Sequence, residues 1–521
     1  MTDEPTTLAA LIEAQAEALG DKPFLHMEDR SISFSELNLQ VNRAANGLAG
    51  LGVKHGVGVS IMMPNSPEWL FVYFATQKLG AYAVPVNVGL KGEGLRHVID
   101  HSDSSILVCH PDYVEAIQAI CGALPKLQQI VVNATGAPDG WRPPEAWRRL
   151  AEVMEASDGN PGVEIDGEAI SALMYTSGTT GPPKGVVSRY KETNIAGIRM
   201  FGAVLKSDDV LYTCLPLFHA NALFLTTVRA LAMGLPMALS RRFSASRFWD
   251  EIRRYGATTF NALGAMIPIL MKQPERPNDA DNPVGLVFSA ACPASVWAEF
   301  EKRFAVRIFE GYAAVDGGGF AIFNFGNSPK GSFGKPMNPI RIVDDEGGEV
   351  APGEPGELIF EVDDAKRRRV EYYKNEEASD AKIRDGWFHT GDLVYADPEG
   401  HLYFVDRKTD SLRRRGENIS SWEVEREIDR HPAVLESAVF GVPSDLGEDE
   451  VMAAVVLKEG EALAAEDLIR HCEEQMARFM VPRYIEFRDA LPKTGTHRIQ
   501  KSVLKREGVG PDTWDRESHK G

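Results

Sequence analysis

Cysteine is scarce in this 521-residue sequence, and long apolar runs are absent from it. The five cysteines form no CxxC pair and no even framework, which favours a reduced, intracellular protein without structural zinc. The clean apolar run at residues 69–75 is far shorter than the ~20 residues that cross a bilayer, and Arg229, Gly234 and Pro236 interrupt the apolar stretch 223–239. The first residues carry acids where a signal peptide needs lysine or arginine, so we expect a soluble, cytoplasmic protein with no transmembrane segment.

Basic residues are outnumbered by acidic ones, 56 to 75, and the formal net charge is −19. An acidic surface repels the phosphates of nucleic acid, so we expect no nucleic-acid partner, and any anionic ligand needs a local positive site. The hydrophobic share of 44% and the charged share of 25% are ordinary for a globular protein and argue against a disordered or fibrous chain.

Helix and strand patterns alternate in the first part of the chain. Ser33 and Glu36 have the spacing of a capping box before an amphipathic helix, and a second helix is expected at 68–78. Short apolar strands are expected at 56–63, 81–86, 106–109 and 130–132. This alternation predicts a largely parallel sheet with helices on both faces.

The pattern of expected elements changes near residue 330, where turn-rich segments separate short strands. After about residue 408 a smaller α+β unit of roughly 110 residues begins. In that unit, Ser420 and Glu423 are expected to cap a helix that stops at His431. Two basic runs, 366–369 and 413–415, are expected to be solvated surface.

The strongest local signal is a loop that follows an apolar strand at 173–176 and reads SGTTGPPKG at 177–185. Its glycines let backbone N–H groups turn toward an anion, its hydroxyls add donors, and its lysine supplies positive charge. This pattern indicates phosphate binding. Pro183 stands directly before Lys184, where the GxxxxGK[ST] pattern has a glycine, so the loop is not of that type.

With this loop, the sequence resembles the AMP-forming adenylating superfamily, which includes acyl-CoA synthetases, luciferases and the adenylation domains of peptide synthetases. The resemblance extends over nearly the whole chain in the expected order, and the run 404–420 is similar to that of crotonobetaine/carnitine-CoA ligase-like members. It implies an α/β fold with a large N-terminal AMP-binding domain (1–408) of two α/β sheet subdomains plus a β-barrel-like part. A small, mobile α+β C-terminal lid (409–521) would follow and rotate about a hinge at 407–410.

The resemblance also implies an activity, which is that of an ATP-dependent acid–CoA ligase working with Mg²⁺. In the first step a carboxylate and ATP would give an acyl adenylate and pyrophosphate. In the second step the thiol of coenzyme A would give acyl-CoA and AMP. The expected partners are a small carboxylic acid, which the sequence does not name, and CoA, and a homodimer is compatible with the sequence.

Site residues are carried over from the motifs that match. Residues expected to hold the nucleotide or CoA are Thr176, Ser177, Gly178, Thr179, Thr180, Gly181, Lys184, Ala291, Glu310, Gly311, Tyr312, Asp392, Arg407, Gly416 and Glu417. Residues expected to act on the reacting groups are Arg498, Thr180, Lys184 and His219. The acyl pocket is expected at His219, Asn221, Phe260, Gly264 and Ala313, and the metal ligand is expected to be Asp316.

The chemistry of the side chains can be compared with the roles that the resemblance assigns to them. Asp392 offers carboxylate oxygens that can accept from the two ribose hydroxyls. His219 lies among apolar residues, where a histidine is usually a satisfied core group, and only the resemblance assigns it to the acyl pocket. Gly416 and Glu417 would line the tunnel for the pantetheine arm of CoA after the lid has rotated.

Three positions depart from the superfamily pattern. Val315 replaces a threonine that touches the α-phosphate, Asp316 replaces a glutamate that binds Mg²⁺, and Arg498 replaces the adenylating lysine. Arginine keeps the positive charge but is planar, so it is not an equivalent of lysine. Two alternatives therefore stay open: a non-catalytic relative that binds nucleotide or acyl-CoA, and an adenylating enzyme with a different acceptor.

Overall fold

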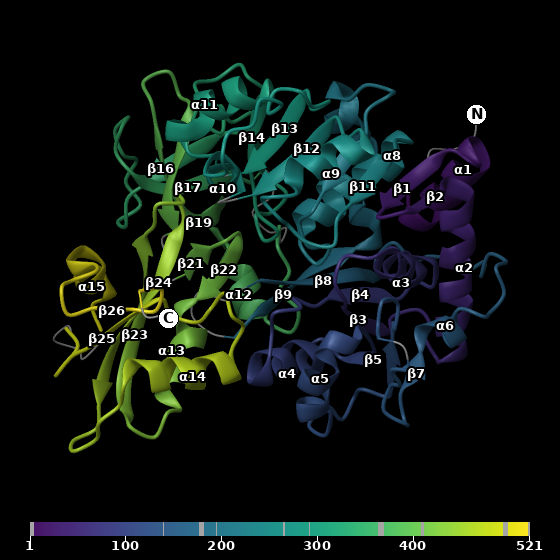
Figure 1. Ribbon diagram of the computed structural model, residues 1–521. Coiled ribbons are helices and arrows are strands. Elements are labelled where there is room, and N and C mark those ends of the chain that lie inside the picture. Colours follow the sequence, from purple (N-terminus) through teal and green to yellow (C-terminus); the bar gives the residue numbers. More distant parts are fainter. Residues whose placement is uncertain are drawn as a thin grey trace.

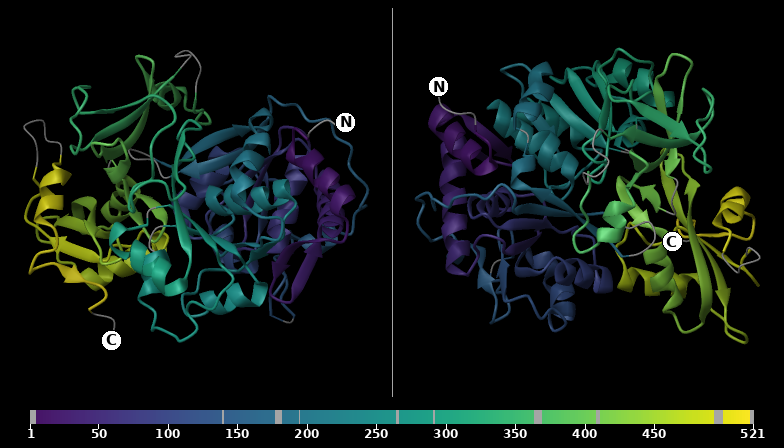
Figure 2. Two further views of the ribbon diagram at one scale, coloured as in Figure 1. Left: turned by 90° about the horizontal axis from the view of Figure 1, so that it is seen from above. Right: turned by 180° about the vertical axis from the view of Figure 1, so that it is seen from behind.

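The computed structural model describes residues 5–138, 140–176, 182–193, 195–263, 266–290, 292–362, 369–407, 411–492 and 499–518. Two sheets with flanking helices form the larger part of the molecule (Figure 1). An antiparallel sheet and a C-terminal α+β unit lie at the end of the molecule away from the N-terminal helices (Figures 1 and 2). Among the described helices, none is both long and apolar enough to cross a membrane.

The first sheet has seven strands in the order β7-β6-β5-β3-β4-β8-β9, and only the pair β8–β9 is antiparallel. It confirms the four expected strands. Its members are β3 (Gly58–Met62), β4 (Tyr82–Pro85), β5 (Ser104–Cys109), β6 (Gln129–Val132), β7 (Arg148–Arg149), β8 (Ile170–Thr176) and β9 (Lys184–Arg189). Near it lie α3 (Pro67–Lys78), α4 (Gly92–His101), a 3₁₀ turn (Pro111–Tyr113), α5 (Val114–Cys121) and α6 (Leu150–Val153).

The second sheet has eight strands in the order β15-β14-β13-β12-β10-β11-β1-β2. These are β1 (Pro23–Met27), β2 (Arg30–Ser33), β10 (Leu211–Thr213), β11 (Met237–Leu239), β12 (Thr259–Leu263), β13 (Leu286–Ala290), β14 (Arg307–Ala313) and β15 (Ala321–Asn324). The accompanying helices are α1 (Leu8–Leu19), α2 (Phe34–Gly50), α7 (Ile195–Phe201), α8 (Arg229–Met233), α9 (Phe248–Tyr255), α10 (Met266–Met271) and α11 (Ala294–Phe304), with 3₁₀ turns at Tyr190–Glu192 and Gly202–Val204 and a π-helix at Asn221–Val228.

One hydrophobic core joins the two sheets. Helix α3 is buried along its whole length, because its residues contact apolar neighbours from both sheets. The expected cap of helix α2 is confirmed, since Ser33 Oγ accepts a hydrogen bond from the Glu36 backbone N–H at 3.1 Å. The shared core therefore fixes the two sheets relative to each other.

The antiparallel sheet is built from β16 (Ile340–Val343), β17 (Gly356–Glu361), β18 (Ile383–Arg384), β19 (Trp387–Ala396) and β20 (Leu402–Arg407), with α12 (Glu376–Asp380) beside it. Its buried side chains form a cluster of their own. This β-rich part begins where the change in pattern near residue 330 predicted it.

The C-terminal unit has its own core and contains a hairpin, a four-stranded sheet and three helices in the part that is described. Its elements are β21 (Ser411–Arg414), β22 (Glu417–Ser420), α13 (Ser421–Asp429), β23 (Val434–Pro443), β24 (Asp449–Leu457), α14 (Ala465–Gln475), β25 (Tyr484–Phe487), α15 (Lys501–Glu507) and β26 (Trp514–Asp515). Ser420 precedes α13 as expected, but its side chain makes no capping bond to the helix.

Candidate active site

A cavity of about 970 Å³ lies where the two α/β sheets, the antiparallel sheet and the C-terminal hairpin meet. Its walls come from strands β8, β9, β13, β14 and β19, from the π-helix and from the turn between β21 and β22. Elements that are hundreds of residues apart in the chain therefore supply one site, which is how α/β folds place ligands at the carboxyl ends of their strands.

Most of the described residues that the sequence assigned to the site line this cavity. They are Thr176, Lys184, His219, Asn221, Glu310, Gly311, Ala313, Asp316, Asp392, Gly416 and Glu417. The predictions for Ser177, Gly178, Thr179, Thr180, Gly181, Gly264, Ala291 and Arg498 lie outside the described residues, as does the side chain of Arg407. Strand β8 ends at the cavity and strand β9 begins there, so both ends of the predicted phosphate loop lie at the cavity.

Asp392 on strand β19 is buried at the cavity wall, with 5% of its surface exposed. Its Oδ2 accepts a hydrogen bond of 2.6 Å from the Tyr312 hydroxyl, and its backbone N–H donates to Thr390 Oγ1 at 3.1 Å. The Tyr312 ring stacks on Phe333, with ring centres 5.0 Å apart. The hydrogen bond from Tyr312 thus orients the Asp392 carboxylate as an acceptor before any ligand binds.

The local positive charge that the sequence required lies at Lys184 and Lys382. Lys184 begins β9, and its Nζ lies 5.3 Å from the centre of the Tyr372 ring. Burial, with the nearby positive charge of Lys382, lowers the pKa of Lys184, and Asp316 opposes this shift. Asp316 Oδ2 accepts from the Tyr372 hydroxyl at 2.6 Å and lies 3.5 Å from Lys382 Nζ. No motif in the sequence marks Lys382.

Glu417 connects the C-terminal unit to the body of the molecule. Its Oε1 lies 2.9 Å from His219 Nε2, and its Oε2 accepts from Asn87 Nδ2 at 3.1 Å. The turn before it has positive φ at both central residues, 54° at Arg415 and 81° at Gly416. Such a turn suits the twist of a two-residue hairpin and favours glycine, so Gly416 helps to project Glu417 into the cavity.

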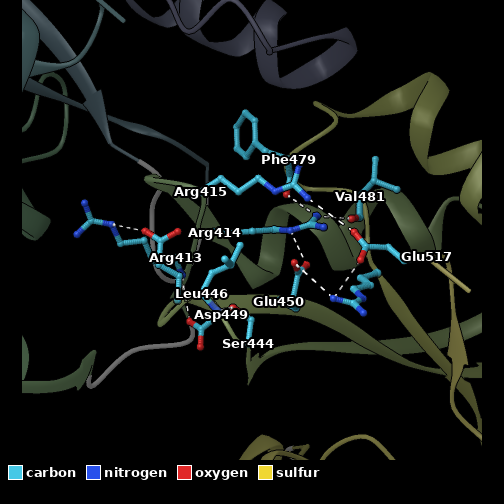
Figure 3. A network of polar contacts seen from close by, with 12 residues as sticks. Arg413, Arg414, Arg415, Ser444, Leu446, Asp449, Glu450, Phe479, Val481 and Glu517 are labelled. Carbon is cyan, nitrogen blue, oxygen red and sulfur yellow. Dashed lines mark hydrogen bonds and ion pairs between the residues drawn. The ribbon is translucent and has the colours of Figure 1, made fainter. Parts of the chain in front are cut away.

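The expectation that 413–415 is solvated surface is wrong for Arg414, which is 1% exposed. Its guanidinium lies 2.6 Å from a carboxylate oxygen of Glu450 and donates to the backbone carbonyls of Phe479 and Val481 at 3.1 and 2.9 Å (Figure 3). The hairpin backbone is held as well, because the Arg413 N–H donates to Asp449 at 3.1 Å. A buried, multiply bonded arginine therefore fixes the hairpin that carries Glu417.

Phe260 does not belong to the cavity wall, contrary to the prediction. It is 1% exposed and packs on Phe248 and Trp249, with ring centres 4.9 and 6.0 Å away. Side chains alternate between the two faces of a strand, and in β12 the next residue is the one on the cavity side. That residue, Asn261, donates to Asn221 Oδ1 at 2.7 Å.

Glu423 on α13 also lines the cavity, and burial raises its pKa from 4.5 to about 7. Since the folded chain holds this proton more tightly than the unfolded chain, the free energy of unfolding should fall as pH rises from 4.5 to about 7. Each pH unit is worth about 1.4 kcal/mol, so the contribution is roughly 3 kcal/mol. Urea unfolding across this window should show a flatter pH dependence for Glu423→Gln than for the unmodified chain. The exposed control Glu461→Gln should change nothing, and equal slopes for all three proteins would contradict the assignment.

Comparisons with known proteins agree with this geometry. A family described as AMP-binding enzyme matches residues 12–363, and the AMP-binding enzyme C-terminal domain matches residues 423–498. The crotonobetaine/carnitine–CoA ligase of Salmonella paratyphi B (strain ATCC BAA-1250 / SPB7) is 31% identical over 509 residues, which cover 94% of this chain and 97% of that protein. The protein of the same name from Proteus mirabilis (strain HI4320) is 30% identical, with 91% and 93% covered.

Solved structures give the same picture. An anthranilate CoA ligase in complex with anthranoyl-AMP is 27% identical, with a TM-score of 0.71 and coverage of 97% of this chain and 98% of that one. A double mutant of o-succinylbenzoate CoA synthetase from Bacillus subtilis, bound to a product analogue, is 25% identical, with a TM-score of 0.79 and coverage of 97% and 99%. The similarity therefore includes both the body and the C-terminal unit.

Proposed function

This chain belongs to the family of AMP-binding enzymes, and we propose that it is an AMP-forming acid–CoA ligase. In the first step a carboxylate oxygen of the acid attacks the α-phosphorus of ATP, and pyrophosphate leaves. In the second step the sulfur of CoA attacks the acyl carbon, and AMP leaves. The observation that carries the proposal is the meeting of the phosphate-loop strands, Asp392 and Glu417 at one cavity.

Positioning and charge neutralisation account for the first step, as they do for phosphoryl transfer in general. Asp392 holds the ribose hydroxyls, and Arg407 assists from the neighbouring strand. Lys184 binds phosphate oxygens together with the loop 177–181, and Arg498 offsets negative charge on the reacting oxygens. Asp316 offers the hard oxygen that Mg²⁺ prefers, and the bound ion would neutralise phosphate charge.

The position of the C-terminal unit supports a role for Glu417 in the second step. The β21–β22 hairpin faces the body, whereas α15, which follows Arg498 in the chain, lies on the outer side of the unit (Figure 1). Glu417 and His219 then border the route to the acyl carbon. We propose that the body ends at residue 408 and that the unit from 409 onward rotates about 407–410, so that Arg498 faces the cavity in the first step and Glu417 faces it in the second.

The proposed location is the cytoplasm, where ATP and CoA are available. All five cysteines are unpaired, which is typical of a reducing compartment. A non-catalytic role is not favoured, because the relatives named above as ligases match the chain over nearly its whole length.

Acid-dependent pyrophosphate release tests the first step. We expect purified chain with Mg-ATP to release pyrophosphate only when a suitable carboxylic acid is present, and to form a hydroxamate when hydroxylamine traps the acyl adenylate. Addition of CoA should accelerate turnover, since it clears the adenylate from the site. Bound ATP without pyrophosphate release across a broad acid panel would contradict the proposal, and release that CoA does not stimulate would indicate another acceptor.

A further inference from the structure

A buried arginine in the cavity wall has no hydrogen-bond partner among the residues that the structure describes. Arg229 begins helix α8 directly after the π-helix, lines the cavity and is 1% exposed. All three nitrogens of its guanidinium lack an acceptor in the described part of the chain. An unpaired buried charge is costly, so a ligand group is the natural partner of this side chain.

The surroundings of Arg229 are aromatic. We call the cluster of Phe201, Phe288, Phe309, Phe323 and Phe325 the phenylalanine pocket, and all five line the cavity. The guanidinium carbon lies 4.1 Å from the ring centre of Phe288 and 5.7 Å from that of Phe201. Ring faces attract the cation, but they leave its in-plane N–H groups without acceptors.

Arg229 stays charged in this environment. Burial lowers its pKa to about 10, which is still well above neutral pH. The two lysines described above, Lys184 and Lys382, both interact with Asp316. The positive charge of Arg229 is therefore available to a group other than the phosphates of ATP. We assign it to the end of the acid that is far from the reacting carboxylate.

We propose that the acid carries a second anionic group, most simply a second carboxylate, which Arg229 binds in the phenylalanine pocket. This inference rests on the proposed ligase function and names its substrate class. One carboxylate of the acid reacts with ATP, and the other accepts hydrogen bonds from the planar guanidinium, which matches carboxylate geometry. The phenylalanine rings cover the carbons between the two groups.

The same charge excludes another class of acid. Carnitine and crotonobetaine, after which the curated relatives are named, carry a permanent positive charge. A cationic group beside Arg229 would bring like charges together in a poorly solvated pocket, where repulsion is much stronger than in water. The substrate of this chain should therefore differ in charge from the substrates for which those relatives are named.

The test compares three acids of matched length that end in a carboxylate, a neutral primary amide or a trimethylammonium group. The unmodified chain should prefer the dicarboxylic acid to its monoamide by about 10²–10³-fold in kcat/KM for pyrophosphate release, and should use the cationic acid least. Arg229→Met should lose this preference while using the monoamide within a few-fold of the unmodified chain. Arg229→Lys, which keeps the charge without the planar fork, should be intermediate.

Thermal unfolding gives a readout that does not depend on catalysis. The dicarboxylic acid should raise the Tm of the unmodified chain but not that of Arg229→Met, which should itself be more stable without ligand because an unpaired charge is removed. Arg303→Met is the matched control, since the side chain of Arg303 is only 10% exposed and is paired with Asp279 at 2.7 Å. That variant should lower Tm and leave acid preference unchanged.

The outcomes separate the inference from the function on which it rests. Preference of the unmodified chain for the neutral or cationic acid, or an unchanged preference in Arg229→Met, would overturn the role of Arg229 and leave the ligase function intact. If no acid supports pyrophosphate release, the ligase function fails, and the Tm shift still decides whether Arg229 binds a dicarboxylate.

Discussion

Replacing Asp392 with alanine is expected to lower kcat/KM for ATP in pyrophosphate release by roughly 10³-fold, because two hydrogen bonds to a buried carboxylate are lost. Asp392 is 5% exposed and is oriented by Tyr312, so little else can replace its oxygens. Tyr312→Phe removes only the supporting hydroxyl and should cost about tenfold. Steady-state kinetics with varied ATP at saturating acid measures both effects.

A nucleotide analogue makes this assignment specific. The unmodified chain should discriminate strongly against 2′,3′-dideoxy-ATP, whereas Asp392→Ala should treat ATP and the analogue almost alike. The control is Glu399→Ala, which removes an exposed acidic residue from the turn after the same strand. Equal discrimination in the unmodified chain and Asp392→Ala would mean that Asp392 does not hold the ribose.

The second large effect is expected at Glu417, which should matter for thioester formation and little for adenylation. Glu417→Gln removes the charge that faces His219 at 2.9 Å and weakens the contact between the hairpin and the body. A displacement of about 1 Å at a reacting group can cost about 10²-fold, and we expect a loss of that size in the second step.

Rapid-quench kinetics separates the two steps. The acyl adenylate of Glu417→Gln should form at a rate within about twofold of the unmodified chain, while its transfer to CoA should be about 10²-fold slower. Glu459→Gln, a change at an exposed residue of the same C-terminal unit, should leave both rates unchanged. A parallel loss in adenylation would contradict a role confined to the second step.

Sequence periodicity predicted the parts of the fold whose signals are local. The strands β3 to β6 are short apolar runs between helices, and Ser33 caps α2 through a contact only three residues away. The predicted phosphate loop was recognisable because its glycines, its hydroxyls and Lys184 are neighbours in the sequence. Such features depend on adjacent residues, so one sequence is enough to find them.

The predictions that were wrong concern residues whose environment is set by tertiary packing. Arg414 looked like one of three solvated arginines, but Glu450 and two carbonyls from a distant segment surround it. Phe260 was assigned to the pocket, although the alternation of β12 turns it toward Trp249. In the sequence, Arg229 appears only as a break in an apolar stretch. The phenylalanine rings around it come from strands and helices that are far from it in the chain, so their proximity could not be predicted.

Product analysis is the most direct test of the proposed AMP-forming ligase activity. Purified chain, Mg-ATP, CoA and the best acid from the panel are incubated together, and acyl-CoA, AMP and ADP are quantified by mass spectrometry. We expect acyl-CoA and AMP in equal amounts, without ADP. Formation of ADP, or of AMP without acyl-CoA, would contradict the assignment as an AMP-forming acid–CoA ligase.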